Sequence, residues 1–493
     1  MPAALSPRTP VIIGVGQVIN RDDNRHADPI TLALEAVERA GADTGAASCA
    51  SGADTVASVA IVSWRYGDAA RLVAQGLGAE NAFTMYPQVG GNTPQLLMNR
   101  ICERISSGTS DLAVLTGAES YRTRMRARRG SIELDWQRED LNLKPDWQDS
   151  DHYEMGHPAE LELGIMMPTQ AYPLFENALW HESGRTQIEH RQFIADLWAG
   201  LSEVALTNPM AWVTEQLTAE QIGSVTPENR LIGFPYTKAM VANPDVNMAS
   251  AAIICSVERA QSLGISPDRW VFPQSGSDAS DPFMTNRTSF TTSAAIRHAG
   301  RAALDLAGTT SAELDFVDVY SCFPSAVQIA CNELEISTDR ELTVYGGLPF
   351  GGGPWNNPVG HAIAAMVQRL REHPGATGLV TANGGNIQKH SFGVYSTEPP
   401  AAGFRTAHPQ FAVDTEPMIE ADSTYSGPVT IETWTVMHER DGTRARAHAV
   451  LRTPTGQRCW ATSSEPDLME LFESQDCVGL SATVADDHSL HLS

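Results

Sequence analysis

Residues 93–120 read TPQLLMNRICERISSGTSDLAVLTGAES, and this stretch decides the class of fold. Its first part, residues 93–106, begins with Thr-Pro and carries apolar side chains at helical spacing, which predicts a helix. Residues 111–117 (DLAVLTG) then form a continuous apolar run that ends in glycine. Such a run is typical of a strand buried on both faces of a parallel sheet. A helix followed by a doubly buried strand predicts an α/β protein.

The same alternation continues on both sides of this stretch. Toward the N-terminus, residues 11–16 (VIIGVG) and 54–63 are predicted strands, and residues 29–40 are a predicted helix. The order returns in the second half of the chain, with predicted helices at 293–307, 325–334 and 362–370 and predicted strands at 314–320 and 378–382. We therefore expect an approximate internal duplication of the order of elements.

Two segments differ in composition from these halves. Residues 121–231 are rich in Trp, Glu, Pro and His and alternate weakly, so we expect an inserted, mostly helical segment. Residues 248–257 (MASAAIICSV) return to buried-strand character. The predicted domains are a first half at 1–120 and 232–265, a loop domain at 121–231, a second half at 266–399 and a C-terminal domain at 400–493.

The C-terminal segment alternates with period two. Residues 427–437, 443–453 and 458–463 show this pattern, and Asp441-Gly442 supplies a hairpin turn. We predict a small antiparallel β domain, a compact barrel of the oligonucleotide/oligosaccharide-binding (OB) type. Residues 400–493 hold 6 Arg and no Lys against 14 Asp and Glu, a net charge of −8. Because a nucleic-acid-binding barrel needs a basic groove, this charge argues against that role.

The composition of the whole chain excludes several further classes. Its 493 residues carry 34 Lys and Arg against 59 Asp and Glu, a formal net charge of −25, which repels phosphate backbones. No apolar run reaches the ~18–20 residues of a membrane span, and residues 1–10 hold no signal-peptide core. Seven cysteines without CxxC or zinc spacing predict free thiols in a cytoplasmic compartment, and no metal site is predicted.

Four motifs occur in an order that resembles the thiolase superfamily, especially its sterol-carrier-type branch. They are residues 89–94 (VGGNTP) with the later Gly117-Ala118-Glu119-Ser120, residues 319–323 (VYSCF), residues 346–361 (GGLPFGGGPWNNPVGH) and residues 381–385 (TANGG). The resemblance covers about residues 10–395. It implies a duplicated thiolase fold of five layers, α-β-α-β-α, with an inserted loop domain, to which this chain adds the C-terminal β domain.

The resemblance also implies which catalytic groups are missing. In thiolases a Cys at a helix N-terminus takes the acyl group, a His activates it, and a second Cys moves the substrate α-proton. Here the nucleophile position falls on Gly90 or Gly91, the His on Gly353 or Asn357, and the second Cys on Ala382. The degenerate pocket is predicted to comprise Gly90, Gly91, Asn92, Ser321, Gly352, Gly353, Asn357, Ala382, Asn383, Gly384 and Gly385.

Four other side chains are candidates for residual chemistry. Tyr320, which stands where the branch has a His, is either a hydrogen-bond donor or acid/base for a thioester, or a core tyrosine. Cys322 is either reactive or packed and inert. His361 is either a base or an exposed histidine at a helix start. His390 is a candidate near the pocket mouth.

One basic run stands out in the acidic chain. The resemblance places Arg122, Arg124 and Arg126 (in YRTRMRARRG) where the loop domain begins and implies that they meet the phosphates of CoA. The alternative is a solvated loop neutralised by acidic neighbours, namely Glu133, Asp135, Glu139 and Asp140.

We therefore predict a thiolase-like protein that binds CoA or acyl-CoA in lipid metabolism, holds no tightly bound cofactor and lacks the residues for Claisen condensation. By homology alone it would be classed as an acetyl-CoA acetyltransferase. One alternative is a retro-aldol carbon–carbon lyase with Tyr320 or Tyr345 as acid/base. Another is a non-enzymatic scaffold or nucleic-acid-binding module centred on residues 400–493. Active thiolases pair through the strand and helix near the nucleophile, so a monomer and a homodimer both remain open.

Overall fold

The computed structural model describes residues 5–149 and 156–492, and two five-stranded sheets form its core. The first sheet has the strand order β1-β7-β4-β2-β3, and the second has the order β12-β8-β11-β10-β9. The strands of the first sheet are β1 (Pro10–Ile19), β7 (Asn247–Ser256), β4 (Leu112–Ser120), β2 (Thr55–Ser58) and β3 (Phe83–Met85). Those of the second are β12 (Arg405–Ala407), β8 (Phe272–Ser280), β11 (Lys389–Ser396), β10 (Thr377–Gly384) and β9 (Phe316–Asp318).

The two sheets repeat the same pairing. In the first, β1 is antiparallel to β7, β7 is antiparallel to β4, and β4 is parallel to β2. In the second, β8 is antiparallel to β11, β11 is antiparallel to β10, and β10 is parallel to β9. The internal duplication predicted from the order of elements is therefore present in the strand topology.

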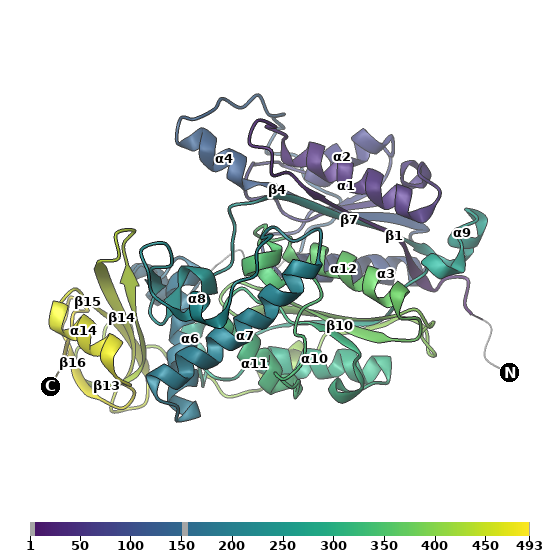
Figure 1. Cartoon of the computed structure of the whole chain (residues 1–493). Coiled ribbons are helices and arrows are strands. Elements are labelled where there is room, and N and C mark those ends of the chain that lie inside the picture. Colours follow the sequence, from purple (N-terminus) through teal and green to yellow (C-terminus); the bar gives the residue numbers. More distant parts are fainter. Residues whose placement is uncertain (1–4, 150–155, 493) are drawn as a thin grey trace.

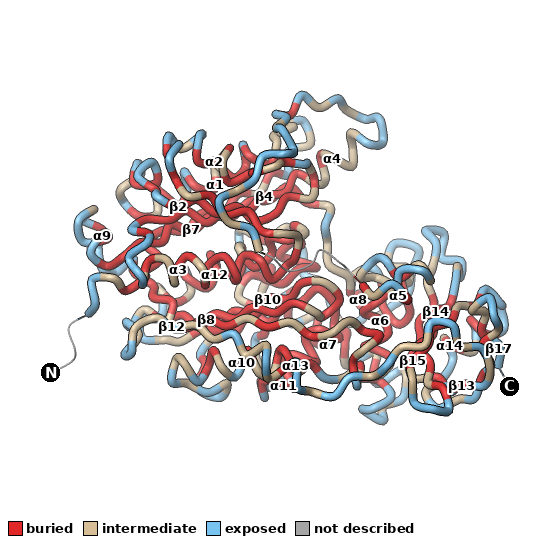
Figure 2. Tube along the Cα trace, turned by 180° about the vertical axis from the view of Figure 1, so that it is seen from behind, coloured by how far each residue is buried: buried red, intermediate tan, exposed pale blue. Residues whose placement is uncertain are grey.

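Helices complete five layers, α-β-α-β-α. The helices α3 (Thr93–Ser106) and α12 (Pro358–Glu372) lie between the two sheets and contact both (Figure 1). The outer layer on the first sheet holds α1 (Pro29–Thr44) and α2 (Ala69–Leu77), and that on the second holds α10 (Ala294–Ala307) and α11 (Pro324–Leu334). Figure 2 shows the two sheets and the central helices as the most buried part of the molecule. The thiolase fold expected from the sequence is confirmed.

Both central helices begin at a proline, at Pro94 and Pro358, whose fixed φ suits the first helical turn. Most of their residues are buried, as expected of helices covered by a sheet on either side. Both helices start at the edge of the sheets where β4, β9 and β10 end. The turns that precede α3 and α12 therefore carry the candidate site.

The inserted loop domain is mostly helical, as predicted. Its elements are α4 (Tyr121–Arg128), α5 (Pro158–Glu162), α6 (Pro168–Ser183), α7 (Gln187–Thr207), α8 (Ala219–Gly223), β5 (Leu231–Gly233) and β6 (Tyr236–Thr237). Further helices are α9 (Val257–Ser262) and α13 (Gln410–Asp414), and short helical turns lie at Cys49–Gly52, Lys238–Met240, Pro267–Arg269, Met284–Asn286, Ser311–Glu313 and Gly347–Gly351.

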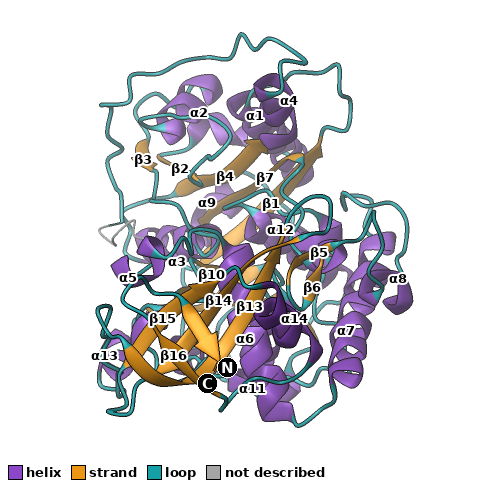
Figure 3. Ribbon diagram, turned by 90° about the vertical axis from the view of Figure 1, so that its left-hand side faces the viewer, coloured by secondary structure: helices purple, strands orange, loops and turns teal. Residues whose placement is uncertain are grey.

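The C-terminal domain is an antiparallel sheet that packs against the loop domain. Its strand order is β15-β14-β13-β16-β17, and β5 of the loop domain also pairs with β13. The bounds are β13 (Gly427–His438), β14 (Arg444–Arg452), β15 (Arg458–Ser463), α14 (Pro466–Ser474), β16 (Ser481–Val484) and β17 (Leu490–Leu492). An isolated bridge joins Thr462 of β15 to Ser489, the residue before β17. Figure 3 shows this sheet beside α6 and α14.

Two short strands, β12 and β5, join sheets on the far side of a predicted domain boundary. Strand β12 lies beyond residue 399, yet it pairs in parallel with β8 in the second core sheet. Strand β5, which begins at Leu231, pairs both with β6 and with β13 of the C-terminal sheet. Both strands are only three residues long and lie next to a predicted boundary. The local composition therefore gives no sign of the sheet that each of them joins. No helix among the described residues is long and apolar enough to cross a membrane.

Candidate functional site

Segments from four parts of the chain meet at the edge of the central layer, and we call this place the closed centre. It comprises the turn before α3, the residues that follow β9, the end of β10 and the loop before α12. Gly91 of the first segment faces Tyr320 of the second and Asn383 of the third. Gly90 donates its N–H to Asn356 Oδ1 of the fourth at 3.0 Å. The structure thus brings together the motifs that the sequence analysis assigned to one pocket.

Gly91 lies against the phenol of Tyr320. A Cβ atom on Gly91 would lie 2.8 Å from Cζ of Tyr320, closer still to the hydroxyl oxygen, and 2.5 Å from the carbonyl oxygen of Asn383. A Cβ on Gly90 would lie 2.5 Å from Asn92 Oδ1. Carbon atoms in van der Waals contact stand about 3.5–4.0 Å apart. Tyr320 therefore fills the space that a nucleophilic side chain at residue 91 would need.

Asparagines occupy the loop before α12. Asn357 immediately precedes Pro358 and donates its Nδ2 to the carbonyl of Gly117 at 2.8 Å and to Ser250 Oγ at 3.0 Å. An amide has no proton-accepting nitrogen at neutral pH, so this side chain cannot replace a catalytic histidine as a base.

The other position considered for the histidine, Gly353, is also committed to structure. Its N–H donates to the carbonyl of Asn243 at 2.9 Å. The neighbouring Gly352 has a positive φ of 112°, and a Cβ there would lie 2.5 Å from Met248 Sδ. The glycine-rich loop therefore packs closely on β7 and on the segment before it, and leaves no added side chain room at Gly352.

A tyrosine of the loop domain covers the end of β10. Tyr172 in α6 donates its hydroxyl to the carbonyl of Gly385 at 3.1 Å and accepts from Asn383 Nδ2 at 3.0 Å. Its ring stacks on Phe323 with centroids 4.4 Å apart. The Nδ2 of Asn383 also lies 3.9 Å from Cys322 Sγ. These contacts hold residues 319–323 and residues 381–385 against the loop domain.

The remaining pocket positions are filled by their neighbours. Ser321 Oγ accepts from the N–H of Leu348 at 3.2 Å, and Ala382 is buried. A Cβ on Gly384 would collide with Asn92 Oδ1, itself a buried atom that finds no hydrogen-bond partner among the described residues. The space once expected for a substrate is thus largely occupied by protein atoms.

Burial sets the protonation of the thiol and the phenols. Burial raises the pKa of Cys322 to about 12, so this thiol stays protonated and inert near neutral pH. Burial, together with the nearby Cys322, raises the pKa of Tyr320 well above its ordinary value. Burial does the same for the pKa of Tyr345. Both phenols can donate a hydrogen bond, and neither is a phenolate at neutral pH.

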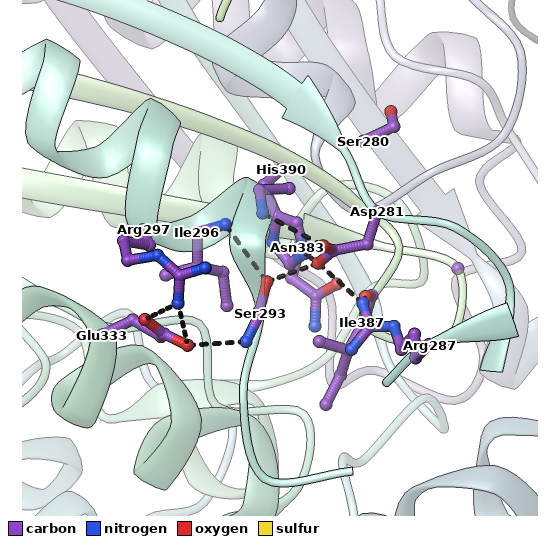
Figure 4. A network of polar contacts seen from close by, with 12 residues as sticks. Ser280, Asp281, Arg287, Ser293, Ile296, Arg297, Glu333, Asn383, Ile387 and His390 are labelled. Atoms are coloured by element: carbon purple, nitrogen blue, oxygen red, sulfur yellow. Dashed lines mark hydrogen bonds and ion pairs between the residues drawn. The ribbon is translucent and has the colours of Figure 1, made fainter. Parts of the chain in front are cut away.

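His390 lies inside the second sheet rather than at a pocket mouth. It belongs to β11 and is 2% exposed, and its Nε2 lies 3.6 Å from Oδ2 of the equally buried Asp281 (Figure 4). Asp281 also accepts from Arg287 Nη2 at 2.7 Å, from the Ser293 hydroxyl and from the N–H of Ala295. Burial raises the pKa of Asp281, but Arg287 and His390 outweigh it and bring the pKa to about 2. The pair is part of a buried ionic network.

His361 is not the exposed helix-start histidine that one reading of the sequence expects. It is fully buried in α12, with Nδ1 2.8 Å from Gln17 Oε1 of β1. Burial lowers the pKa of His361 to about 3, so the ring is neutral. The sequence shows a histidine four residues into a helix, but not that a second sheet covers this face.

The three arginines after β4 are engaged within the protein. Arg122 forms ion pairs with Asp23 at 2.9 Å and Asp245 at 3.1 Å, and Arg126 forms one with Asp23 at 3.3 Å. The guanidinium of Arg124 lies 4.9 Å from the ring centroid of Trp64. Their partners come from distant segments rather than from the acidic neighbours at 133–140 that the sequence offered.

A small cavity of about 10 Å³ lies on the side of the closed centre that faces α10 and α11. Tyr320, Asn383 and His390 are among the residues that line it. A cavity of ~10–15 Å³ is the least that admits one water molecule, so this arrangement can hold a water but not a thioester. In the described ranges, no group of three or more His, Cys, Asp or Glu side chains is placed to hold a metal ion.

The duplicated five-layered core and the motifs at its centre define a member of the thiolase superfamily. Human mitochondrial 3-ketoacyl-CoA thiolase in complex with CoA is similar at 14% identity and a TM-score of 0.57, over 80% of this chain and 99% of that chain. An Ltp2-ChsH2(DUF35) aldolase is similar at 19% identity and a TM-score of 0.59, over 80% of this chain and 99% of that chain. At these identities the likeness concerns the fold.

A second set of comparisons defines the family. A monomeric SCP2-thiolase-like protein type 1 from Mycobacterium smegmatis is 30% identical, with a TM-score of 0.83, over 99% of each chain. Residues 409–489 match the family model of the additional C-terminal domain of thiolase-like protein type 1. The chain belongs to the SCP2-thiolase-like proteins type 1. None of the curated proteins matches it.

The sequence analysis missed three residues of the closed centre and its surroundings. Asn356 accepts a hydrogen bond from Gly90 and lies beside Asn357 in the same motif. Its position next to Asn357 is the sequence feature that could have indicated it. Tyr172 lies in the loop domain, where no motif marks it. Asp281 follows the polar strand β8, whose pattern resembles a loop.

Proposed function

We propose that the protein binds CoA or acyl-CoA without carrying out Claisen condensation or thiolysis. The observation that carries this proposal is the contact between Tyr320 and Gly91, which leaves no space for an acyl-accepting side chain. Asn357 and Ala382 supply neither the base nor the second thiol of a thiolase. Loss of a covalent nucleophile alone typically lowers turnover on the order of a millionfold.

The ligand part of the proposal rests on the class of protein. The human thiolase among the similar structures is described in complex with CoA. The small cavity beside Tyr320 and Asn383 has a volume of only about 10 Å³, so the thioester of a bound acyl-CoA would lie outside it. Arg122 and Arg126 are already paired, so Arg124 is the remaining phosphate candidate of the three.

Calorimetry with CoA and acetyl-CoA, combined with a coupled thiolysis assay on acetoacetyl-CoA, tests both parts. We expect saturable binding, no thiolysis product and no mass increase of the intact protein after incubation with acetyl-CoA. Arg124→Ala should weaken CoA binding several-fold, whereas the matched variant Arg122→Ala should stay within twofold. An acetyl group found on Cys322 or Cys102, or no binding of CoA, would overturn the proposal.

A retro-aldol lyase is the second candidate, because Tyr320 and His390 line the same small cavity. The base in such a reaction must take a proton, and the raised pKa of Tyr320 makes it a donor rather than a base. This candidate therefore has less support. Release of an aldehyde or ketone from a β-hydroxyacyl-CoA, abolished by Tyr320→Phe or Tyr345→Phe, would favour it.

The C-terminal domain gives little support to a nucleic-acid role. Arg444 pairs with Glu473, and Arg452 and Arg458 both pair with Glu432. We propose that the domain is a barrel of the OB type, closed by the Thr462–Ser489 bridge, that serves as a packing and ligand-binding unit.

We also propose that the protein is a monomer, like the relative from Mycobacterium smegmatis. The edge strand β3 is covered by a loop of its own chain, because Tyr86 donates its N–H to the Trp147 carbonyl at 3.1 Å and Trp147 donates its N–H to Thr84 at 2.9 Å. A covered edge does not pair with a second copy. Gel filtration at the mass of one chain, 53.2 kDa, is the expected result.

A further inference from the structure

A groove of about 810 Å³ lies where the C-terminal domain meets the loop domain, and we call it the junction groove. Residues 225–231, which lead into β5, line one side. The hairpin turn between β13 and β14 and the helix α14 line the other. Pockets that hold small molecules have volumes of roughly 300–1,000 Å³. The groove shares no lining residue with the closed centre.

The groove carries excess positive charge in a strongly acidic chain. Three arginines line it, Arg230, Arg440 and Arg444, against two carboxylates, Asp441 and Glu473. Because the whole chain carries −25, a local excess of arginine is unusual here. Arginine offers planar pairs of N–H donors that match phosphate and carboxylate oxygens.

One of the carboxylates is already neutralised. Glu473 lies 2.8 Å from Arg444 Nε and 2.8 Å from His438 Nε2, both residues of the groove. Burial raises the pKa of Glu473, but hydrogen bonds and charge from His438 and Arg444 bring it below the ordinary value. The carboxylate of Glu473 is therefore ionised and paired with Arg444 and His438, and it forms no ion pair with the other two arginines of the groove.

The second carboxylate is turned toward its own loop. Asp441 accepts from the N–H of Thr443 at 3.0 Å and from its hydroxyl at 2.7 Å. Arg440 is exposed and forms no ion pair in the described part of the chain, and Arg230 donates only to the backbone carbonyl of Leu231, at 2.8 Å. Two guanidinium groups from different domains thus remain available to one anion.

Apolar side chains complete the groove. Val225, Pro227 and Leu231 come from the loop domain, and Pro466 and Met469 come from α14. Val225 is 48% exposed, although it is a large apolar residue. A ligand that covered these residues would gain about 25 cal/mol for each Å² of apolar surface removed from water.

We propose that the junction groove binds an amphipathic organic anion, whose phosphate or carboxylate group meets Arg230 and Arg440 and whose apolar body covers Val225, Leu231 and Met469. The C-terminal domain then contributes half of a ligand site rather than a separate module. This proposal does not depend on binding of CoA, because the groove and the closed centre are built from different residues.

Calorimetry on the full chain with octyl phosphate, octanoate and inorganic phosphate tests the proposal. We expect octyl phosphate or octanoate to bind with saturation, and inorganic phosphate to bind at least tenfold more weakly because it lacks the apolar body. The comparison of octyl phosphate with octanoate identifies the preferred head group. Arg440→Glu should weaken binding of the tighter ligand at least tenfold, and Arg230→Glu should do the same.

Arg446→Glu is the matched control, because Arg446 is exposed on β14, the strand that follows the turn of Arg440, and lies outside the groove. It changes the net charge equally and should leave affinity within twofold. Arg440 is exposed in a turn, so its replacement leaves the fold intact. Absence of binding in the wild type, or equal losses in Arg440→Glu and Arg446→Glu, would overturn the proposal. Failure of CoA to bind would contradict the proposed function and not the groove.

Discussion

The closed centre and the junction groove are both places where separate packing units meet, yet one is full and the other is open. The cavity that Tyr320 and Asn383 line at the closed centre has a volume of about 10 Å³, and the groove has a volume of about 810 Å³. In the closed centre, Tyr320, Asn356 and Asn357 contact the backbone of the opposite segments. In the groove, Arg440 contacts no acidic partner among the described residues.

This difference shows that the thiolase fold is kept here while its central turns are packed together and a groove is open elsewhere. The ends of β4, β9 and β10 meet in the core as in the thiolase fold. In this protein, Tyr320, Asn356 and Asn357 fill the space between them. The domain that this family adds creates a new concave surface at its contact with the loop domain. Function resides in such sites and not in the fold alone.

The largest expected effect concerns the contact that fixes the C-terminal domain beside the groove. Arg458 is fully buried and donates to the carbonyls of Met284 and Arg287 at 2.6 Å and to Glu432 Oε2 at 2.8 Å. Arg458→Leu leaves the buried carbonyls of Met284 and Arg287 without this donor, and Glu432, which is 17% exposed, keeps only Arg452. Removing one member of a buried pair costs about 3–5 kcal/mol. Chemical denaturation should show this loss in the free energy of unfolding.

The control for Arg458 is its neighbour on the same carboxylate. Arg452 pairs with Glu432 at 2.8 Å but is partly exposed. Arg452→Leu should therefore cost less than about 1 kcal/mol. Equal losses in the two variants would show that burial of Arg458 does not hold the domain in place, and that the groove is less fixed than the structure indicates.

The next effect tests whether the closed centre is as full as it looks. Gly91→Ala places a methyl group against the ring of Tyr320, and overpacking of this kind costs about 1–3 kcal/mol. Tyr320→Ala removes the obstacle but leaves a cavity, at a cost of about 3 kcal/mol. Because the two side chains compete for one space, the double variant should lose less than the sum by about 1 kcal/mol or more. Additive losses in urea denaturation would argue against the contact.

Much of the core could be predicted from the sequence because its signals are local. The helix α3 was predicted with its observed bounds, since Thr-Pro marks its start and apolar spacing marks its length. Strands β8 and β11 were missed, because FPQSGSDAS and KHSFGVYS alternate poorly and are rich in Gly and Ser. A Cβ at Gly393 of β11 would collide with Gln95 of α3, so these residues are small because a polar helix face lies on them.

The site was predictable only as a set of positions. Motif order located Gly91, Tyr320 and Asn383, but no local pattern shows that the phenol of residue 320 fills the space at residue 91. The partners of Arg122, Asp23 and Asp245, lie about a hundred residues away in each direction, so the sequence offered nearer acids instead. Both the contact of Tyr320 with Gly91 and the ion pairs of Arg122 depend on packing between segments far apart in the chain. No local pattern in a single sequence predicts such packing.

The last prediction compares two buried carboxyl groups of the core sheets with the carboxyl group in the groove. Burial raises the pKa of Glu119 in β4 to about 7 and that of Asp318 in β9 to about 7. A carboxyl group whose folded pKa is raised gives stability that is complete below its unfolded pKa, near 4, and is lost as pH rises through the folded value. Between pH 5 and 8, the wild type should therefore lose on the order of 2 kcal/mol relative to Glu119→Gln.

The comparison with a variant is needed because buried His361 and His448 titrate in the opposite sense, their folded pKa values being lowered by burial. These contributions cancel when the difference between wild type and variant is followed by denaturation at several pH values. Glu473 in the groove is the contrast, because its folded pKa is lowered and its stability is lost only as pH falls through that value. Glu473→Gln should thus shift the free energy of unfolding by a constant amount from pH 5 to 8. The measured quantity is the difference in the free energy of unfolding between wild type and variant, plotted against pH. If this plot had the same slope for Glu473→Gln as for Glu119→Gln, the two carboxyl groups would not differ in the direction of their pKa shifts.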